Sequence, residues 1–119
     1  GIYSTLKASV SDENFIISCD TPFINKELLT LLQTNSGNYD IVLPVYNDKI
    51  QPITGFFKKP ALRVISLQIE LKNYVPVNIF EKCNTKFLYI NDSVLPNPDK
   101  LFFNINNAGD YQEALRRFI

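Results

Sequence analysis

Apolar runs that alternate with amphipathic segments set the pattern of this chain. Phe15–Ile17 and Asp40–Val45 carry short apolar runs of the kind found in strands that are covered on both faces of a parallel sheet. Ile50–Phe57 follows a turn after the second run, which favours a hairpin between these two strands. Thr85–Ile90 and Leu101–Ile105 repeat the strand pattern nearer the end of the chain. The sequence therefore predicts a sheet built from short strands.

The segments between these predicted strands have apolar residues at helical spacing. Gly1–Ser9 has the spacing of the tail of a short helix, and Pro60 begins another periodic segment that ends near Asn73. Asn25 is a cap residue ahead of a leucine-rich segment, and Asn107 is expected to cap the last helix. The apolar stripe of that last helix consists of Tyr111, Ala114, Leu115 and Phe118.

Strands and helices alternate along the chain, which predicts an α/β fold with a mainly parallel sheet and helices on both faces. The 119 residues are enough for one domain with a hydrophobic core. In such sheets ligands bind beyond the carboxyl ends of the strands. Ser18–Thr21 and Asn104–Asn107 are both expected at such ends.

The composition excludes several classes of function. Twelve basic and twelve acidic residues cancel, so no overall positive field would hold the chain on nucleic acid or on an anionic membrane. The sequence has no apolar run long enough to span a bilayer, and the cytoplasm is the expected location. The chain has no histidine, and Cys19 and Cys83 lie far apart without the spacing of a zinc site. Zinc enzymes and histidine-based catalysis are therefore excluded.

Asp20 is the candidate metal ligand. It follows a strand that is expected to be buried, so its carboxylate should emerge on a tight turn at the carboxyl edge of the sheet. Mg²⁺ prefers one or two carboxylates together with the phosphates of a substrate. The alternative is that Asp20 caps the helix after Pro22, and the residue pattern alone favours this structural role.

Asn104 and Asn106 form the second candidate group. In an extended segment both side chains point to one side, while Phe103 and Ile105 point to the other. Two neighbouring amides can donate and accept hydrogen bonds toward a ligand such as a phosphate. The same pattern fits a strand with one polar face, so both interpretations stay open.

Other polar residues are expected to have structural roles. Lys58 and Lys59 precede a predicted helix and fit a solvated surface better than a phosphate site. Arg116 and Arg117 place favourable charge at the C-terminal end of the last helix. Cys19 is expected to be a small buried apolar residue beside the turn.

Four segments together resemble one enzyme family. FIISCDTPFINKELL, at residues 15–29, resembles the metal-site segment of the molybdenum cofactor guanylyltransferases. In that family an apolar strand leads into Cys-Asp, a Pro-Phe or Pro-Tyr pair and a leucine-rich helix. Three further segments resemble the same family in the same order: GIYSTLKAS, DIVLPVYNDKIQPITGFF and LFFNINNAGDYQEAL. The resemblance covers essentially the whole chain.

The resemblance implies a Rossmann-like, three-layer α/β/α nucleotidyltransferase domain with a mostly parallel sheet. Asp20 would be the catalytic residue that binds Mg²⁺ and the nucleotide phosphates, and Asn104 and Asn106 would lie beside the pterin. The implied reaction transfers GMP from GTP to molybdopterin, the molybdenum-pterin cofactor, with release of pyrophosphate. The alternatives are a related cytidylyltransferase, a sugar-phosphate nucleotidyltransferase and a non-catalytic α/β interaction module.

The resemblance also implies that part of the family's domain is missing. The family has a glycine-rich loop that holds the nucleotide phosphates, whereas the four glycines here are dispersed at positions 1, 37, 55 and 109. Residues 1–119 are therefore expected to be the C-terminal part of a single nucleotidyltransferase domain that lacks its first strands and is inactive alone. The exposed sheet edge would favour a homodimer.

Overall fold

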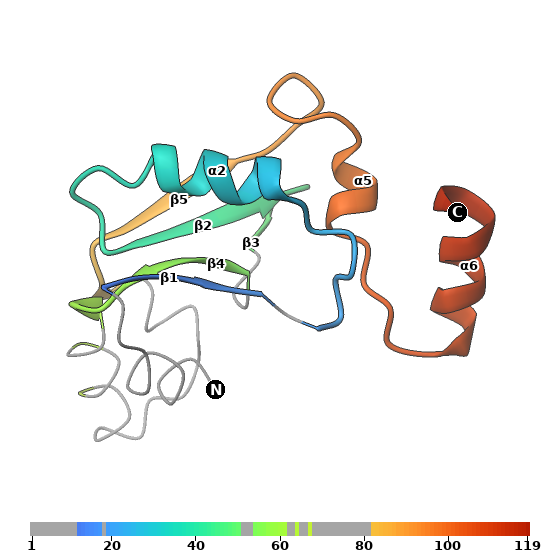
Figure 1. Cartoon of the computed structure of the whole chain (residues 1–119), viewed down its shortest axis with the longest axis horizontal. Helices are drawn as coiled ribbons and strands as arrows, with labels where there is room; N and C mark the ends of the chain where they lie inside the picture. Colours follow the sequence, from blue (N-terminus) through green and yellow to red (C-terminus); the bar gives the residue numbers. More distant parts are fainter. Residues whose placement is uncertain (1–11, 18, 51–53, 62–63, 65–66, 68–81) are drawn as a thin grey trace.

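The structure is a computed structural model that describes residues 12–119 except 18, 51–53, 62–63, 65–66 and 68–81 (Figure 1). Its elements are β1 (Glu13–Ile16), α2 (Lys26–Thr34), β2 (Ile41–Tyr46), β3 (Lys49–Ile50), β4 (Gly55–Lys58), β5 (Thr85–Tyr89), α5 (Pro98–Leu101) and α6 (Ala108–Phe118). The helix expected at Gly1–Ser9, and most of the one expected from Pro60 to Asn73, lie outside the described residues. Among the described residues, no helix has the length and apolar character needed to cross a membrane.

β4 lies between β1 and β2 and is antiparallel to both. Phe56 of β4 is paired with Phe15 on one side and with Val42 on the other. β5 joins the opposite side of β2 and runs parallel to it, with Leu43 opposite Phe87. β1, β2 and β5 therefore point in one direction, and β4 runs against them. The predicted α/β fold is confirmed, and the strand directions of the sheet are mainly but not wholly parallel.

The predicted hairpin is confirmed. β2 turns into β3 through Asn47 and Asp48, whose φ angles of 52° and 61° lie in the left-handed region. Asn and Asp tolerate this region better than most residues, and two such residues in succession suit the twist of a hairpin. Tyr46 and Lys49 face each other across the turn. β4 then returns beside the first residues of β2.

Gly55 allows β4 to lie close to β2. A Cβ atom at this position would lie 2.9 Å from the Val42 carbonyl oxygen and 2.7 Å from Cδ2 of Leu43. The backbone oxygen cannot move aside without disturbing the sheet, so a residue with a side chain does not fit here.

α2 covers one face of the sheet (Figure 1). Its side chains Leu28 and Leu32 are fully buried and pack in one core cluster with Val42 and Phe56. Oδ1 of Asn25 accepts the backbone N–H of Leu28 at 3.0 Å, which confirms the predicted N-cap. Leucines one helical turn apart thus determine which face of α2 contacts the sheet.

β1 is more exposed than its apolar run predicts. Phe15 and Ile17 expose 39% and 44% of their surface, so the prediction of a strand covered on both faces is wrong. Within the described residues β1 pairs only with β4, and a strand at the edge of a sheet has fewer neighbours to cover it. Phe15 still packs on Phe56, with ring centroids 5.3 Å apart.

Homodimer formation through β1 stays a prediction. An edge strand with exposed apolar side chains can pair with the same strand of a second copy around a two-fold axis. We expect light scattering to give the mass of a dimer, and Ile17→Lys to give the mass of a monomer, because a charge beside the edge opposes strand pairing. Tyr89→Lys changes an exposed position on β5 and is the control, which should remain dimeric. A monomeric parent chain would contradict the prediction.

The strand predicted at Leu101–Ile105 does not form, and the short helix α5 ends at its first residue. Leu101–Ile105 predicts a strand, but Leu101 ends α5 and residues 103–106 belong to no strand. This prediction is wrong because Pro98 begins a helical turn, in which the Phe102 N–H donates to the Pro98 carbonyl at 3.1 Å. A strand also needs a neighbour to pair with, and a short apolar pattern does not reveal one.

The end of β2 holds α5 in place. The Tyr46 ring stacks on the Phe102 ring, with centroids 5.3 Å apart. The Tyr46 hydroxyl donates a hydrogen bond to the Asp99 carboxylate, and this bond raises the pKa of Tyr46 above its ordinary value. α5 therefore lies at the carboxyl end of β2 (Figure 1).

Candidate functional site

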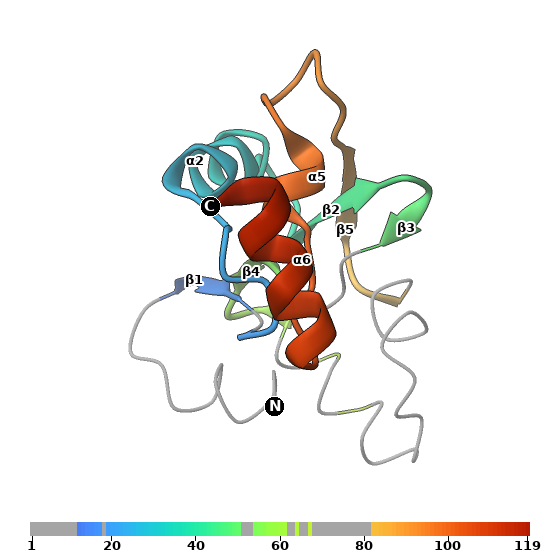
Figure 2. The ribbon, with the colours of Figure 1, turned by 90° about the vertical axis from the view of Figure 1, so that its right-hand side faces the viewer.

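The site residues predicted from the sequence lie at the carboxyl edge of the sheet. β1, β2 and β5 end toward the side where α5 and α6 lie, and Figure 2 looks onto this side with α6 in front of the sheet. The backbone N–H of Ile105 donates to the carbonyl oxygen of Asp20 at 2.8 Å. This hydrogen bond joins the turn after β1 to the segment before α6. Two segments that are far apart in the sequence therefore meet at this edge.

Asp20 is exposed on the turn that follows β1. It does not cap α2, because Asn25 occupies the N-cap and supplies the capping oxygen, so the helix-cap interpretation is wrong. The Cys19 thiol lies 3.8 Å from Oδ1 of Asp20, within reach of a weak hydrogen bond. The carboxylate is thus presented at the edge where ligands bind in α/β sheets.

Asn104 and Asn106 are exposed, whereas Phe103 and Ile105 are half-buried. The predicted alternation is confirmed, although the segment is not a strand. The two asparagines flank Ile105, whose hydrogen bond keeps them next to the turn of Asp20. The structure thereby brings all the predicted site residues into one neighbourhood.

The residues after Asn106 form a cap that fixes the start of α6. Oδ1 of Asn107 accepts the Asp110 N–H at 2.8 Å, and Oδ2 of Asp110 accepts the Asn106 N–H at 3.0 Å. Reciprocal bonds of this kind satisfy N–H groups that a helix start leaves without partners. The predicted cap at Asn107 is confirmed, and it holds the backbone of Asn106 while the Asn106 side chain stays exposed.

An aromatic cluster fastens α6 to both segments of the site. The ring of Phe118 contacts those of Phe23 and Phe103, with centroids 5.7 Å and 5.4 Å away. Phe23 lies three residues after Asp20, and Phe103 lies beside the candidate asparagines. The Arg117 guanidinium covers the Phe118 ring, 4.8 Å from its centroid. Edge-to-face ring pairs of this kind hold the two segments against α6.

Lys58, Arg116 and Arg117 bind to groups of the chain other than Asp20. Nζ of Lys58 donates to the Gly37 carbonyl at 2.7 Å and closes the turn after α2. Arg116 and Arg117 both lie near the Glu113 carboxylate within α6, where positive charge near the C-terminal end is favourable. These contacts account for Lys58 and the two arginines without a phosphate ligand.

The ligand atoms that the chain offers at Asp20 suit a cation whose remaining ligands come from water and from a substrate. In the part of the chain that the structure describes, no three histidine, cysteine, aspartate or glutamate side chains come together as metal ligands. A single carboxylate cannot fill an octahedral shell, but Mg²⁺ keeps waters and takes further oxygens from phosphates. Asp20 therefore fits a Mg²⁺ ion that arrives with a nucleotide, and it does not fit a permanently bound structural metal.

A hollow of about 690 Å³ lies at the opposite end of β1 and is lined by Asp12, Glu13, Lys58 and Pro60. It is larger than the hollow of about 380 Å³ beside the turn of Asp20. Its two carboxylates repel phosphate, and Lys58 is bonded to Gly37. Since ligands of α/β sheets bind at the carboxyl ends of strands, we place the candidate site at Asp20.

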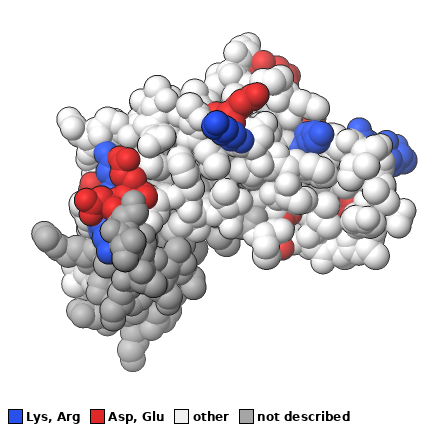
Figure 3. Space-filling model, in the orientation of Figure 1, with Lys and Arg blue, Asp and Glu red and all other residues white. Residues whose placement is uncertain are grey.

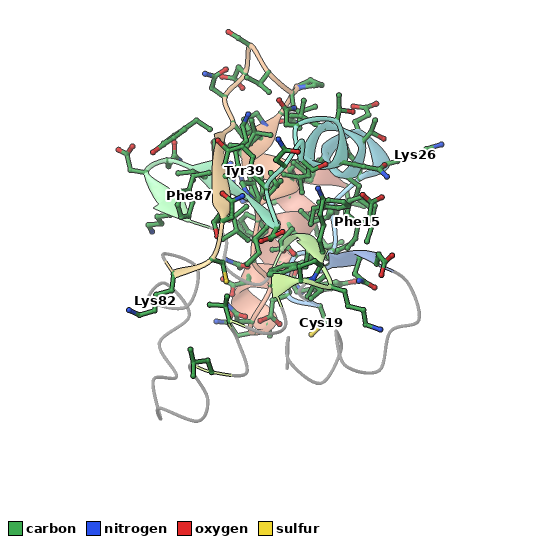
Figure 4. All side chains as sticks on the ribbon, turned by 90° about the vertical axis from the view of Figure 1, so that its left-hand side faces the viewer. Phe15, Cys19, Lys26, Tyr39, Lys82 and Phe87 are labelled. Atoms are coloured by element: carbon green, nitrogen blue, oxygen red, sulfur yellow. The ribbon has the colours of Figure 1, made fainter. Side chains whose placement is uncertain are left out.

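The two cysteines differ in their surroundings. Cys19 is exposed, so the expectation of a small buried residue is wrong, because the turn carries it outward at the sheet edge. Figure 4 shows its sulfur at the margin of the described side chains. Burial and, to a smaller extent, the nearby Asp40 carboxylate raise the pKa of Cys83 to about 11.

We expect iodoacetamide at pH 8 to alkylate Cys19 and to leave Cys83 essentially unmodified. The thiolate is the reactive form, and a pKa of about 11 leaves about one Cys83 thiol in a thousand ionised at that pH. Raising the pH should increase Cys83 labelling about tenfold per pH unit, because the thiolate fraction rises by that factor. Peptide mass spectrometry measures both sites, and Cys83→Ala is the control, with total labelling at pH 8 unchanged. Equal labelling of the two cysteines at pH 8 would contradict the prediction.

Two solved structures share this fold. Molybdopterin-guanine dinucleotide biosynthesis protein A from Archaeoglobus fulgidus matches with a TM-score of 0.79 and 19% identity, over 95% of this chain and 58% of its own. A protein from Aquifex aeolicus matches with a TM-score of 0.72 and 19% identity, over 89% of this chain and 54% of its own. The fold therefore places the chain in the structural class of these α/β domains.

The chain belongs to the family of MobA-like NTP transferase domains, whose family model matches residues 1–74. It is similar to the probable molybdenum cofactor guanylyltransferase of Clostridium perfringens, with 28% identity over 98% of this chain and 61% of that protein. The probable molybdenum cofactor guanylyltransferase of Carboxydothermus hydrogenoformans is 26% identical over 99% of this chain and 60% of that protein. The chain thus spans about three fifths of the length of these relatives.

Proposed function

We propose that this chain forms part of a nucleotidyltransferase that transfers GMP from GTP to molybdopterin. The observation that carries the proposal is the hydrogen bond from Ile105 to Asp20, which unites the two candidate segments at the carboxyl edge. The names of the relatives, probable molybdenum cofactor guanylyltransferases, support the choice of substrates. Membership of the NTP transferase family supports the type of reaction.

In the proposed reaction, an oxygen of the terminal phosphate of molybdopterin attacks the α-phosphorus of GTP. The bond from that phosphorus to the bridging oxygen breaks, and pyrophosphate leaves. The exposed carboxylate of Asp20 would hold Mg²⁺, which when bound would neutralise charge on the phosphates. Asn104 and Asn106 would lie beside the pterin, where amide groups can donate and accept hydrogen bonds. Positioning and charge neutralisation dominate phosphoryl chemistry, so a chain without histidine can take part in it.

The chain by itself is proposed to be inactive. Nucleotide phosphates need a cradle of backbone N–H groups or basic side chains. Of the described glycines, Gly37 lies in the turn after α2, Gly55 in β4 and Gly109 in α6, so they form no such cradle together. The part of the relatives that this chain does not span is where we expect the cradle to lie.

The test is the release of pyrophosphate when the chain, and any longer protein of which it is a part, receives GTP, Mg²⁺ and molybdopterin. We expect guanylylated molybdopterin from the longer protein and none from the 119-residue chain alone. CTP in place of GTP tests a cytidylyltransferase, and a sugar phosphate in place of molybdopterin tests a sugar-phosphate nucleotidyltransferase. Product from either substitute but not from GTP and molybdopterin would overturn the proposal.

A further inference from the structure

A hollow of about 380 Å³ lies beside the turn of Asp20, and none of the roles described above accounts for it. It lies between the residues that lead into α2 and those around α5, two elements that Figures 1 and 2 both show side by side. Its walls include Pro22, Phe23, Pro96 and Lys100. The volume falls in the range of small-molecule sites, and the prolines and the ring supply the apolar part of a wall that is polar and apolar in about equal measure.

Lys100 supplies the positive charge of this hollow. Its Nζ lies 5.3 Å from the centroid of the Phe23 ring, so the ammonium group is held over the wall. Arg116 and Arg117 are paired with Glu113, whereas the described residues show no ion pair of Lys100. Figure 3 shows positive side chains over α5 and α6 on this face of the molecule. The charge of Lys100 is therefore not neutralised by a carboxylate in the described structure.

Asn97 adds an amide group to the hollow. Its φ of 57° lies in the left-handed region, which asparagine tolerates better than most residues. Although Asn97 precedes α5, its side chain makes no capping hydrogen bond. Asn25, which also lines the hollow, uses its side chain to cap α2. Asn97 is thus the amide in this wall that has no capping role.

We propose that this hollow receives the planar ring system of the acceptor substrate, with Asn97 bonded to the ring edge and Lys100 paired with the acceptor phosphate. This inference rests on the proposed function, in which the acceptor is a phosphorylated pterin. A wall of mixed polar and apolar character that carries the Asn97 amide and the Lys100 ammonium group suits a polar-edged ring joined to a phosphate. Phe23 follows Asp20 by three residues, a chain length of at most about 11 Å. A ligand that lies in the hollow can therefore direct its phosphate toward Asp20.

The experiment measures the binding of molybdopterin to the chain by isothermal titration calorimetry. We expect Lys100→Met to weaken binding about tenfold or more, because the variant keeps the apolar stem and removes the charge that pairs with the phosphate. Lys100→Arg keeps the charge and should restore most of the affinity. Enzymatically dephosphorylated molybdopterin is the second probe, and it should bind the parent and Lys100→Met equally.

Asn97→Gly tests the ring edge separately. Glycine adopts a positive φ at no cost, so this variant removes the amide and keeps the backbone. This variant should bind both the phosphorylated and the dephosphorylated pterin about threefold to tenfold more weakly than the parent. Lys26→Met is the matched control, since Figure 4 shows the Lys26 side chain extending away from the body of the protein, and its affinity should equal that of the parent.

Equal affinity of the parent and Lys100→Met for molybdopterin would overturn the inference, as would an equal loss in Lys26→Met. Lys100→Ala gives a second variant in case the methionine substitution perturbs the fold. GMP transfer combined with an unchanged affinity in Lys100→Met and Lys100→Ala would leave the proposed function standing and remove this subsite. A loss of affinity in Lys100→Met and Lys100→Ala that is specific to the phosphorylated pterin, without GMP transfer by a longer protein, would support the subsite and count against the proposed function.

Discussion

In a longer protein that contains this chain, replacing Asp20 with asparagine is expected to lower the rate of GMP transfer by about a hundredfold or more. The substitution keeps the size of the side chain but removes the negative charge that would hold Mg²⁺ between the substrate phosphates. Asp20 is exposed, and Asn25 rather than Asp20 caps α2. Pyrophosphate release measures the rate, and the Mg²⁺ concentration that gives half of the maximal rate should rise.

Asp12→Asn is the matched control for this prediction. Asp12 is also exposed, but it lies at the amino end of β1, so the same chemical change occurs at the opposite end of the strand from Asp20. We expect Asp12→Asn to transfer GMP at the parent rate. A parent-like rate in Asp20→Asn, with an unchanged Mg²⁺ requirement, would show that Asp20 is not the metal ligand.

Phe56→Ala is expected to lower the free energy of unfolding by about 3–5 kcal/mol. Phe56 is fully buried in β4, between β1 and β2, and it packs in one core cluster with Leu28 and Leu32 of α2. Its removal would leave a cavity between the sheet and α2 that the surrounding strands cannot fill. Because small domains are stable by only about 5–15 kcal/mol, this is a large part of the total. Urea unfolding followed by circular dichroism measures the change.

Tyr111→Ala serves as the control for the loss of an aromatic ring. Tyr111 lies on α6 and exposes 51% of its surface, so we expect a change within about 0.5 kcal/mol. Phe56→Leu fills most of the site and should lose less than Phe56→Ala. Equal losses in Phe56→Ala and Tyr111→Ala would mean that the described core does not stabilise the fold as proposed.

The sequence predicted the local features of the fold well. The caps at Asn25 and Asn107 are confirmed, because each depends on a side chain and a backbone N–H three residues further on. The strands at β2 and β5 are confirmed. β2 is buried between β4 and β5, whereas β5 pairs only with β2 among the described strands and stays partly exposed. The hairpin turn at Asn47 and Asp48 follows from the few residue types that accept a positive φ.

The failed predictions concern features that depend on distant neighbours. Phe15–Ile17 has the apolar pattern of a covered strand, yet β1 pairs with a single strand in the described sheet and stays half-exposed. Leu101–Ile105 has a strand pattern, yet Pro98 begins a helical turn and no strand pairs with the residues that follow. Cys19 is small and apolar in character, yet its turn places it at the surface.

For the candidate site, too, local sequence suggested which residues are involved, and the fold was needed to choose between their possible roles. The residue types at Asp20, Asn104 and Asn106 suggested metal and pterin binding, but the pattern alone also allowed a helix cap and a polar strand face. The structure removes the first of these alternatives, because Asn25 is the cap of α2. The hollow with Lys100 and Asn97 had no sequence signal, since its walls come from two segments that lie more than one element apart.

By itself the sequence determined where α2 and α6 begin and where the chain turns after β2, and it selected the candidate residues for phosphate chemistry. These properties depend on side chains within a few positions of each other, and their physical causes are local. Only the tertiary structure decided that the turn of Asp20 meets the segment of Asn104 and Asn106, and that β4 approaches β2 closely enough to require Gly55. Both depend on where the chain returns after many residues, which is set by the packing of the whole sheet and not by any short stretch of residues.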